Sequence, residues 1–206
     1  MIEMVLASRN RKKIAEFETL LCSLSSVKVK ILSLDDIGYS GNIEENGTSF
    51  EENARIKASV PAKMGYIGIA DDSGLCVDKL GGSPGIYSAR YAGEPSDDER
   101  NNEKILSVLD GVPDSERGAK FVCAIACVFP DEMKLHGRED IAARGECAGV
   151  MLTSKRGDNG FGYDPLFFCP ETDKTFAEMT ADEKNKISHR AKAIALLAEK
   201  LDALSQ

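Results

Sequence analysis

The sequence contains little of what a zinc site or a membrane anchor needs. It has two histidines, His136 and His189, and no C-x-x-C pair among its six cysteines, so ligands for a closed zinc site are scarce. Cys123 and Cys127 would lie about 13 Å apart along an extended strand, too far to share one metal ion. The longest apolar run, Phe121–Phe129, is about half of the roughly 20 residues that a membrane-spanning helix requires. We therefore expect reduced thiols, a buried strand at this run and no membrane segment.

An excess of positive charge is also missing. The chain carries 26 Lys and Arg against 34 Asp and Glu, which gives a net charge of −8. Nucleic acids and anionic membranes are bound without sequence preference by basic surfaces, so neither is expected as a partner. A small anionic ligand stays possible where a local basic cluster or a metal serves it. The first residues enter an apolar strand without the basic segment of a signal peptide, and we expect a cytoplasmic protein.

The common phosphate-binding fingerprints are absent as well. There is no G-x-x-x-x-G-K-[ST] loop, and no G-x-G-x-x-G lies between a strand and a helix. Any nucleotide would therefore be bound by other loops.

The apolar patterns that are present predict an α/β fold. With 206 residues and 42% hydrophobic composition, the chain is long enough for one domain over residues 1–206. Strand and helix patterns alternate early and strands cluster late, which favours a mixed central sheet with helices on its faces. Strands are expected at 4–7, 27–34, 67–71, 119–130, 134–140 and 141–151, the last two as an antiparallel pair. Helices are expected at 14–24, from 49 toward 61, at 96–109 and at 187–201.

Three S/T-x-x-E patterns are typical of capping boxes at helix starts. They pair Ser49 with Glu52, Ser96 with Glu99, and Thr180 with Glu183. Each predicts a helix that begins just after its Ser or Thr.

A basic loop follows the first expected strand. Arg9, Arg11, Lys12 and Lys13 lie where a helix begins, and free backbone N–H groups and the helix dipole favour a phosphate there. The alternative is a solvated basic first turn, although cations at a helix N-terminus oppose the dipole unless an anion is present.

Carboxylates gather near two other loops. Glu44 and Glu45 are adjacent, and Asp71 and Asp72 end an apolar run. Mg²⁺ binds one or two carboxylates together with substrate phosphate oxygens, so these residues are candidate ligands. If the strand continues through Asp71 and Asp72, their side chains point to opposite faces. A solvated acidic turn is the other interpretation.

Two late segments complete the candidates. In "GDNGFGYDP" the glycines would let the backbone approach a ring and Phe161 stack on it, or the segment is an ordinary hairpin loop. Near the C-terminal helix, Lys186 and Arg190 have i, i+4 spacing, which by itself favours an exposed, charged helix start. The same holds for Asn53 and Lys57.

Taken together, these segments resemble the inosine triphosphate pyrophosphatase family. The similarity covers nearly the whole chain in five ordered blocks: S-x-N-x-x-K from Ser8, "SFEENARIKA", "ADDSGLCVDKLGGSPGIYSARYAG", "GFGYDPLFF" and "ISHR". The resemblance implies a mixed α/β sheet in two lobes flanking a nucleotide-binding cleft, and a homodimer. It also implies Mg²⁺-dependent hydrolysis of deaminated purine nucleoside triphosphates (ITP, dITP and XTP) to the monophosphate and pyrophosphate.

Residue roles follow from the same resemblance. Asp72 would be the proton acceptor and a metal ligand, with Glu44 as a second ligand. Substrate would be bound by the first loop (Ser8, Arg9, Asn10, Arg11, Lys12, Lys13), by Ser73, by the base-binding loop (Phe161, Gly162, Tyr163, Asp164) and by Lys184, His189 and Arg190, with Asn53 and Lys57 as further candidates.

One departure and two alternatives remain. Asn159 stands where the family more usually has glycine, and asparagine tolerates left-handed backbone geometry. A pyrophosphatase with another base preference, such as a modified pyrimidine, is the second functional hypothesis. A nucleotide sensor without turnover is the third.

Overall fold

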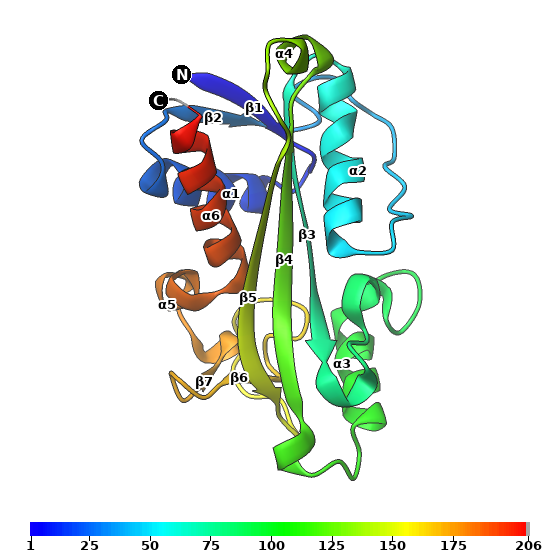
Figure 1. Ribbon diagram of the computed structural model, residues 1–206. Coiled ribbons are helices and arrows are strands. Elements are labelled where there is room, and N and C mark those ends of the chain that lie inside the picture. Colours follow the sequence, from blue (N-terminus) through cyan, green and yellow to red (C-terminus); the bar gives the residue numbers. More distant parts are fainter. Residues whose placement is uncertain (205–206) are drawn as a thin grey trace. The chain divides into compact units, whose positions relative to one another are not determined.

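The fold is α/β with a mixed sheet, as the sequence predicts, and the sheet of the described residues has seven strands where six were expected. The structure is a computed structural model, and it describes residues 1–204 (Figure 1). In the sheet, β1 pairs in parallel with β2 and β3, whereas β6 pairs antiparallel with β5 and β7. Across the sheet the strands are β2 (Val29–Leu32), β1 (Ile2–Leu6), β3 (Ile67–Val77), β4 (Gly118–Val128), β5 (Ile141–Met151), β6 (Phe167–Cys169) and β7 (Lys174–Thr175).

Six α-helices and four short 3₁₀ helices complete the described part of the chain. The α-helices are α1 (Arg11–Leu24), α2 (Phe50–Lys63), α3 (Asp98–Val108), α4 (Asp131–Leu135), α5 (Ala181–Ile187) and α6 (His189–Ala203). The 3₁₀ helices are η1 (Asp78–Leu80), η2 (Gly85–Arg90), η3 (Asp114–Glu116) and η4 (Phe176–Glu178). Within residues 1–204 no helix combines the length and the apolar character needed to cross a membrane.

The chain divides into two compact units. Unit 1 contains Met1–Asp72, Cys123–Gly145 and the residues from Arg190 onward, and unit 2 contains Ser73–Val122 and Glu146–His189. The boundaries fall inside β3, β4 and β5, so each of these long strands contributes to both units.

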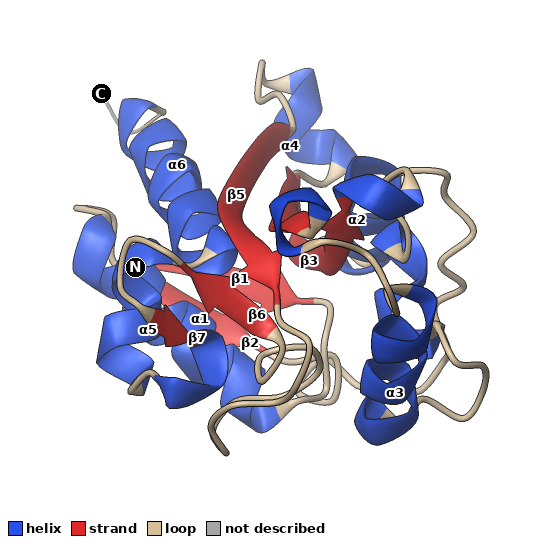
Figure 2. Cartoon of the chain, turned by 90° about the horizontal axis from the view of Figure 1, so that it is seen from below, coloured by secondary structure: helices blue, strands red, loops and turns tan. Residues whose placement is uncertain are grey.

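Unit 1 has helices on both faces of its part of the sheet. Phe17 of α1 and Leu197 of α6 are fully buried in one apolar cluster with the strands. On the other face α2 presents alanines to β3 and β4, and α2 and α6 lie on opposite sides of the strands in Figure 2. The contact is close: a Cβ added to Gly68 would lie 2.0 Å from the carbonyl oxygen of Ala58. Small residues are therefore required where α2 meets β3.

Unit 2 has a separate core that is rich in aromatic side chains. Phe121, Phe167 and Phe176 are buried together, with ring centroids 4.7–5.5 Å apart. Ile105 and Leu109 anchor α3 in the same cluster and are fully buried. Burial of each such side chain contributes about 1.5–3 kcal/mol, so α3 is a firmly held element.

Two local predictions were wrong. Residues 134–140 do not form a strand, since α4 ends at Leu135 and a turn follows. Ser96 does not cap α3: Asp97 is the N-cap, its side chain accepts a hydrogen bond from the N–H of Arg100, and the hydroxyl of Ser96 donates to the carbonyl of Ala89. Asp and Ser are comparable N-caps, so adjacent candidates compete.

Two helix starts are confirmed. Ser49 caps α2, although the Glu52 carboxylate reaches back to Thr48 rather than to Ser49, so only half of the expected box forms. Thr180 and Glu183 make a full capping box on α5.

Two segments differ from their predicted extent. The strand expected at 67–71 runs on to Val77, so Asp71 and Asp72 lie inside β3 and not in a turn. The C-terminal helix is interrupted at Ser188, whose extended backbone (ψ 153°) separates α5 from α6. Lys186 and Arg190 therefore lie on different helices and do not share a face.

Candidate functional site

The first loop forms the N-terminus of α1. The amide of Asn10 donates to the hydroxyl of Ser8 at 3.1 Å, and the side-chain oxygen of Asn10 accepts from the N–H of Lys13 at 3.2 Å. Asn10 thus acts as the N-cap of a 14-residue helix. Helix N-termini present backbone N–H groups and the positive end of the dipole, which suits a phosphate.

The cations of this loop point to different partners within unit 1. Arg9 donates to Asp35 and to the carbonyls of Tyr39 and Gly41, at 2.8–3.1 Å. Arg11 contacts Asp36 at 3.4 Å, an exposed pair. Lys12 lies in α1, but its side chain is outside the described structure.

Asp71 is the buried partner of two predicted substrate-binding cations. Its carboxylate lies 2.6 Å from the Nζ of Lys13 and 3.5 Å from Nη2 of Arg190, and its side chain is 2% exposed. Burial alone would raise the pKa of Asp71, but the charges of Lys13 and Arg190 outweigh it and hold that pKa well below its usual range. Arg190 is itself buried, so the exposed helix start favoured by its spacing is wrong.

Asp72 faces a different set of residues, as the alternation along a strand predicts. Lys57 of α2 donates to Asp72 at 2.8 Å and to Glu45 at 2.8 Å, and Asn53 donates to Asp72 at 3.4 Å. Because Asp71 contacts α1 and α6 while Asp72 contacts α2, the two carboxylates point to opposite faces of β3. Asn53 is buried and Lys57 nearly so, which corrects the exposed-surface interpretation of this pair.

The environment of Asp72 shifts its protonation. Burial raises the pKa of Asp72, the charge of Lys57 offsets only part of that effect, and Glu45 raises it further. Burial also acts on Glu45, but there the hydrogen bond and charge of Lys57 outweigh it and lower the pKa of Glu45. A carboxyl whose pKa is moved toward neutrality is suited to accept a proton.

A second cluster lies in unit 2, on the loop that carries Phe161. The amide of Phe161 donates to the Asp164 carboxylate at 3.0 Å, and Lys184 donates to the same carboxylate at 2.6 Å. The Nζ of Lys184 also lies 5.1 Å from the centre of the Phe161 ring, which is 62% exposed. An exposed aromatic face beside a buried ion pair is an arrangement suited to stack a flat base.

The other predicted residues of unit 2 have separate surroundings. The buried hydroxyl of Tyr163 donates to the carbonyl of Ser88 at 2.8 Å. The ring of His189 stacks on Phe121 with centroids 4.8 Å apart. Ser73 is half-buried on β3, directly after Asp72 in the chain.

Comparison with known proteins adds a family to this geometry. Residues 4–200 match the Ham1 family. The chain belongs to the Ham1 family. Its similarity to curated relatives named "dITP/XTP pyrophosphatase" confirms the predicted resemblance: it is 47% identical to the one from Bacillus subtilis, covering 98% of both chains, and 46% identical to the one from Clostridium perfringens, covering 99% of both.

A solved structure agrees with the family assignment. The Staphylococcus aureus Ham1 protein superposes with a TM-score of 0.87 at 41% identity, covering 98% of this chain and 99% of that one. The similarity thus extends over nearly the whole chain.

Within this Ham1 fold, the glutamate that shares a cation with Asp72 is Glu45, the neighbour of the Glu44 named in the sequence prediction. Both glutamates are exposed, but Glu45 shares Lys57 with Asp72. Adjacent glutamates on an irregular loop have no periodicity that could distinguish them. Lys57 was the one indication in the sequence, because it lies one turn after Asn53 on α2. In the structure Lys57 pairs with Glu45.

The Ham1 loop with Asn159 does not need the left-handed tolerance that was expected of it. The positive φ angles fall on its neighbours Gly157, Gly160 and Gly162, at 83°, 82° and 59°, and Asn159 is not among the positive-φ residues. A Cβ at Gly160 would lie 2.0 Å from the Asp164 carboxylate. Glycine is therefore required beside Asn159, where the Asp164 side chain folds against the backbone.

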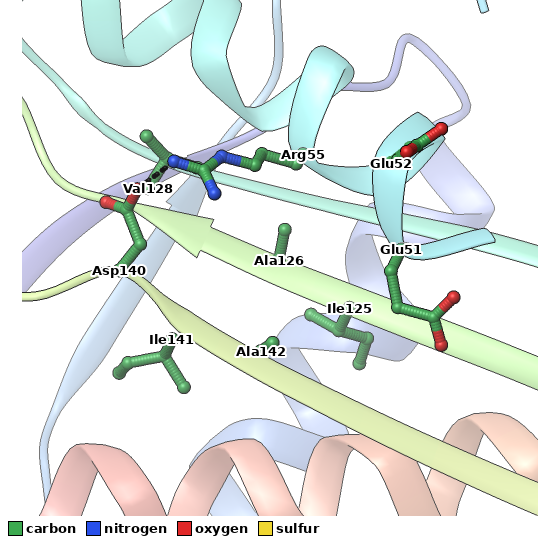
Figure 3. Close-up of a pocket in the computed structure, with 9 residues that line it drawn as sticks. All are labelled: Glu51, Glu52, Arg55, Ile125, Ala126, Val128, Asp140, Ile141 and Ala142. Carbon is green, nitrogen blue, oxygen red and sulfur yellow. Dashed lines mark hydrogen bonds and ion pairs between the residues drawn. The ribbon is translucent and has the colours of Figure 1, made fainter. Parts of the chain in front are cut away.

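A pocket elsewhere in unit 1 contains none of these residues among the nine that line it (Figure 3). It measures about 270 Å³ and is bordered by Glu51 and Arg55 of α2 and by Ile125 and Ile141 of the strands. Arg55 pairs with Asp140 across its edge at 3.4 Å. The predicted site residues that the structure brings together lie elsewhere, in one group around Asp71 and Asp72 of β3 in unit 1 and in one group on the Phe161 loop of unit 2.

Proposed function

We propose that this Ham1 chain hydrolyses dITP, XTP and ITP to the nucleoside monophosphate and pyrophosphate. Family membership and the name of its relatives support the reaction class. The observation that carries the proposal is the Asp72–Lys57–Glu45 cluster, because a buried carboxyl with a raised pKa and a second carboxylate beside it are what water activation requires.

The phosphates are assigned to the N-terminus of α1. Ser8 and Asn10 order the loop, and the first amides of the helix supply uncharged donors. Lys13, held by Asp71, adds a positive charge at the same helix end. A triphosphate bound there would meet the first amides of the helix and the ammonium of Lys13.

Mg²⁺ is the proposed cofactor, and the donor set fits it. Asp72 and Glu45 supply two carboxylates that are close enough to share the ammonium of Lys57, which lies 2.8 Å from each. When bound, Mg²⁺ would neutralise charge on the phosphate oxygens. Its ligands would be Asp72 and Glu45, in place of the pair predicted from sequence, Asp72 and Glu44.

Asp72 is the proposed proton acceptor. The oxygen of a water molecule attacks the α-phosphorus, and a proton of that water passes to the Asp72 carboxylate. The bond between the α-phosphorus and the oxygen that bridges it to the β-phosphorus breaks, and pyrophosphate leaves with the electrons of that bond. Asn53 and Lys57 fix the orientation of the carboxylate from α2. An oriented general base of this kind contributes about 10²–10⁴-fold to rate.

The base is assigned to the loop of unit 2. Phe161 provides a stacking face, and Lys184 beside its ring is a donor for the 6-keto oxygen that hypoxanthine and xanthine present. Adenine presents an amino group there, which would leave a buried donor unpaired at a cost of about 1–3 kcal/mol. The location of this nucleotide in a cleft, the homodimer and the cytoplasmic location are further parts of the proposal, and they rest on the family resemblance.

A nucleotide panel tests the function. Purified protein with Mg²⁺ is given ITP, dITP, XTP, GTP, ATP, dUTP and dTTP, and products are separated by ion-exchange chromatography. We expect pyrophosphate and monophosphate, with the highest kcat/KM on dITP, ITP and XTP. Release of orthophosphate alone contradicts the reaction, preference for dUTP or dTTP supports the pyrimidine alternative, and tight ITP binding without product supports a sensor.

A further inference from the structure

Two side chains of helix α3 hold the backbone of Gly162, the residue after Phe161. The N–H of Gly162 donates to the Asp98 carboxylate at 2.7 Å, and the carbonyl of Gly162 accepts from the side-chain amide of Asn102 at 2.8 Å. Asp98 and Asn102 are four residues apart, so they lie on one face of the helix. The two peptide units that flank Gly162 are thereby each fixed by one side chain from an element about 60 residues away in the chain.

The backbone conformation of Gly162 restricts the conformation of the loop. Gly162 has a φ of +59°, a region that other residues rarely adopt. On the near side Asp164 accepts from the amide of Phe161, and Lys184 pairs with Asp164. The backbone on both sides of the Phe161 side chain is thus anchored, at the Phe161 amide by Asp164 and at Gly162 by α3.

The α3 anchor is not a consequence of apolar packing. Asn102 and Phe161 both line a hollow of about 370 Å³ beside the loop, so no side chain fills that space. Asn102 is 3% exposed, and its amide orientation is set by its donation to Gly162. Hydrogen bonds therefore define the loop on this side.

The helix that makes these bonds is itself well fixed. Ile105 and Leu109 bury it in the core of unit 2, and Asp97 caps its start. Asn101 accepts from the amide of Ala92 and donates to the carbonyl of Ala89, so the adjacent asparagine secures a second segment. A rigid element that contacts a loop through its backbone can set the position of the loop's side chains.

We propose that Asp98 and Asn102 are positioning residues for base recognition. They act by orienting the backbone of Gly162 and, through it, the Phe161 ring. The proposal rests on the proposed function, since Phe161 is taken as the stacking residue. It assigns to α3 a role in substrate affinity, not in the chemical step. The two hydrogen bonds between Gly162 and the side chains of Asp98 and Asn102 are called the clamp below. Loss of the clamp should raise KM for ITP while leaving kcat nearly unchanged.

The test uses four variants of the full chain. Asp98→Ala removes the acceptor, Asp98→Asn keeps a neutral one, Asn102→Asp replaces the donor by a carboxylate facing a carbonyl, and Glu103→Ala is the control on the exposed side of the same helix. Steady-state kinetics on ITP are combined with amide hydrogen exchange of the Gly160–Asp164 segment. Thermal unfolding checks that each variant is folded.

We expect the KM of Asp98→Ala to rise at least tenfold with kcat within threefold, and exchange of the loop to accelerate. Asp98→Asn should recover part of the affinity, and Glu103→Ala should match the wild type. If Asn102→Asp does not fold, Asp98, which is exposed, still gives the answer. Unchanged loop exchange, or faster exchange with unchanged KM, overturns the proposal.

Failure of the clamp differs from failure of the proposed function. Wild-type protein that hydrolyses none of dITP, XTP and ITP contradicts the function itself. Hydrogen exchange does not depend on turnover, so in that case unchanged exchange in Asp98→Ala still overturns the clamp. Faster exchange would then support the structural half of the proposal.

Discussion

The two units hold their functional side chains by different means. In unit 1 buried charges are held by other buried or half-buried charges, as in Lys13–Asp71–Arg190 and Glu45–Lys57–Asp72. In unit 2 an exposed aromatic ring is held through hydrogen bonds to its neighbouring backbone. Charge compensation suits groups that must meet phosphates and a cation, whereas a backbone-held loop suits a flat, nearly neutral base.

The largest effect is expected at Asp72, the proposed proton acceptor of unit 1. Asp72→Asn keeps the shape of the side chain but removes the basic oxygen, so kcat on ITP should fall by about 10²–10⁴-fold. Circular dichroism should show an unchanged fold. Near-normal pyrophosphate release by this variant would remove Asp72 from its role.

The other carboxylate of β3 should matter for stability. Asp71→Asn leaves the buried Arg190 with only Glu16, 3.8 Å away, as a counter-charge, which we expect to lower the free energy of unfolding by about 3 kcal/mol at pH 7. Urea unfolding measures this. A change below about 1 kcal/mol would mean that the two cations are compensated in another way.

The same pair predicts a pH dependence. The folded-state pKa of Asp71 lies below its unfolded value, so its stabilisation is complete above the ordinary aspartate pKa near 4 and is lost as the pH falls toward the folded value. Between pH 7 and pH 3 the wild type should therefore lose more stability than Asp71→Asn. Parallel curves would contradict this assignment.

Adjacent glutamates provide a matched pair for the metal site. Glu45→Gln should raise the Mg²⁺ concentration for half-maximal activity at least about tenfold, because it removes a proposed ligand, while Glu44→Gln should resemble the wild type. Magnesium titrations of both variants at saturating ITP give the comparison. The reverse pattern would return the role to Glu44.

The smallest of these effects is expected at the stacking face of unit 2. Phe161→Ala should raise KM for ITP about tenfold, within the 1–3 kcal/mol typical of base–aromatic stacking, and Phe161→Tyr should not. Steady-state kinetics with both variants decide this. Equal KM values for alanine and tyrosine would exclude stacking at this position.

What could be predicted from the sequence depended on how local the cause was. Helical apolar spacing and the Ser49 and Thr180 caps are set within a few residues, and the structure confirms them. The similarity to known blocks gave the family, which the comparisons confirm. The mixed sheet followed from the order of strand and helix patterns.

The buried charges could not be predicted in the same way. Two adjacent aspartates read locally as a turn, and only cations from α1, α2 and α6 allow β3 to continue through them. The break at Ser188 separates two helices whose apolar residues face different cores, and periodicity alone joined them. Glu45 and the Asp98–Asn102 clamp depend on contacts of the same long-range kind.

The division of labour between the units is tested most directly by one ratio, kcat/KM for ITP over kcat/KM for ATP. It is measured for the wild type, for Glu45→Gln and for Lys184→Met, which removes a proposed donor beside the Phe161 ring. Glu45→Gln should slow both substrates equally and leave the ratio unchanged, whereas Lys184→Met should lower it about tenfold. A ratio that falls in Glu45→Gln, or that is unchanged in Lys184→Met, would contradict the assignment of phosphates to unit 1 and of the base to unit 2.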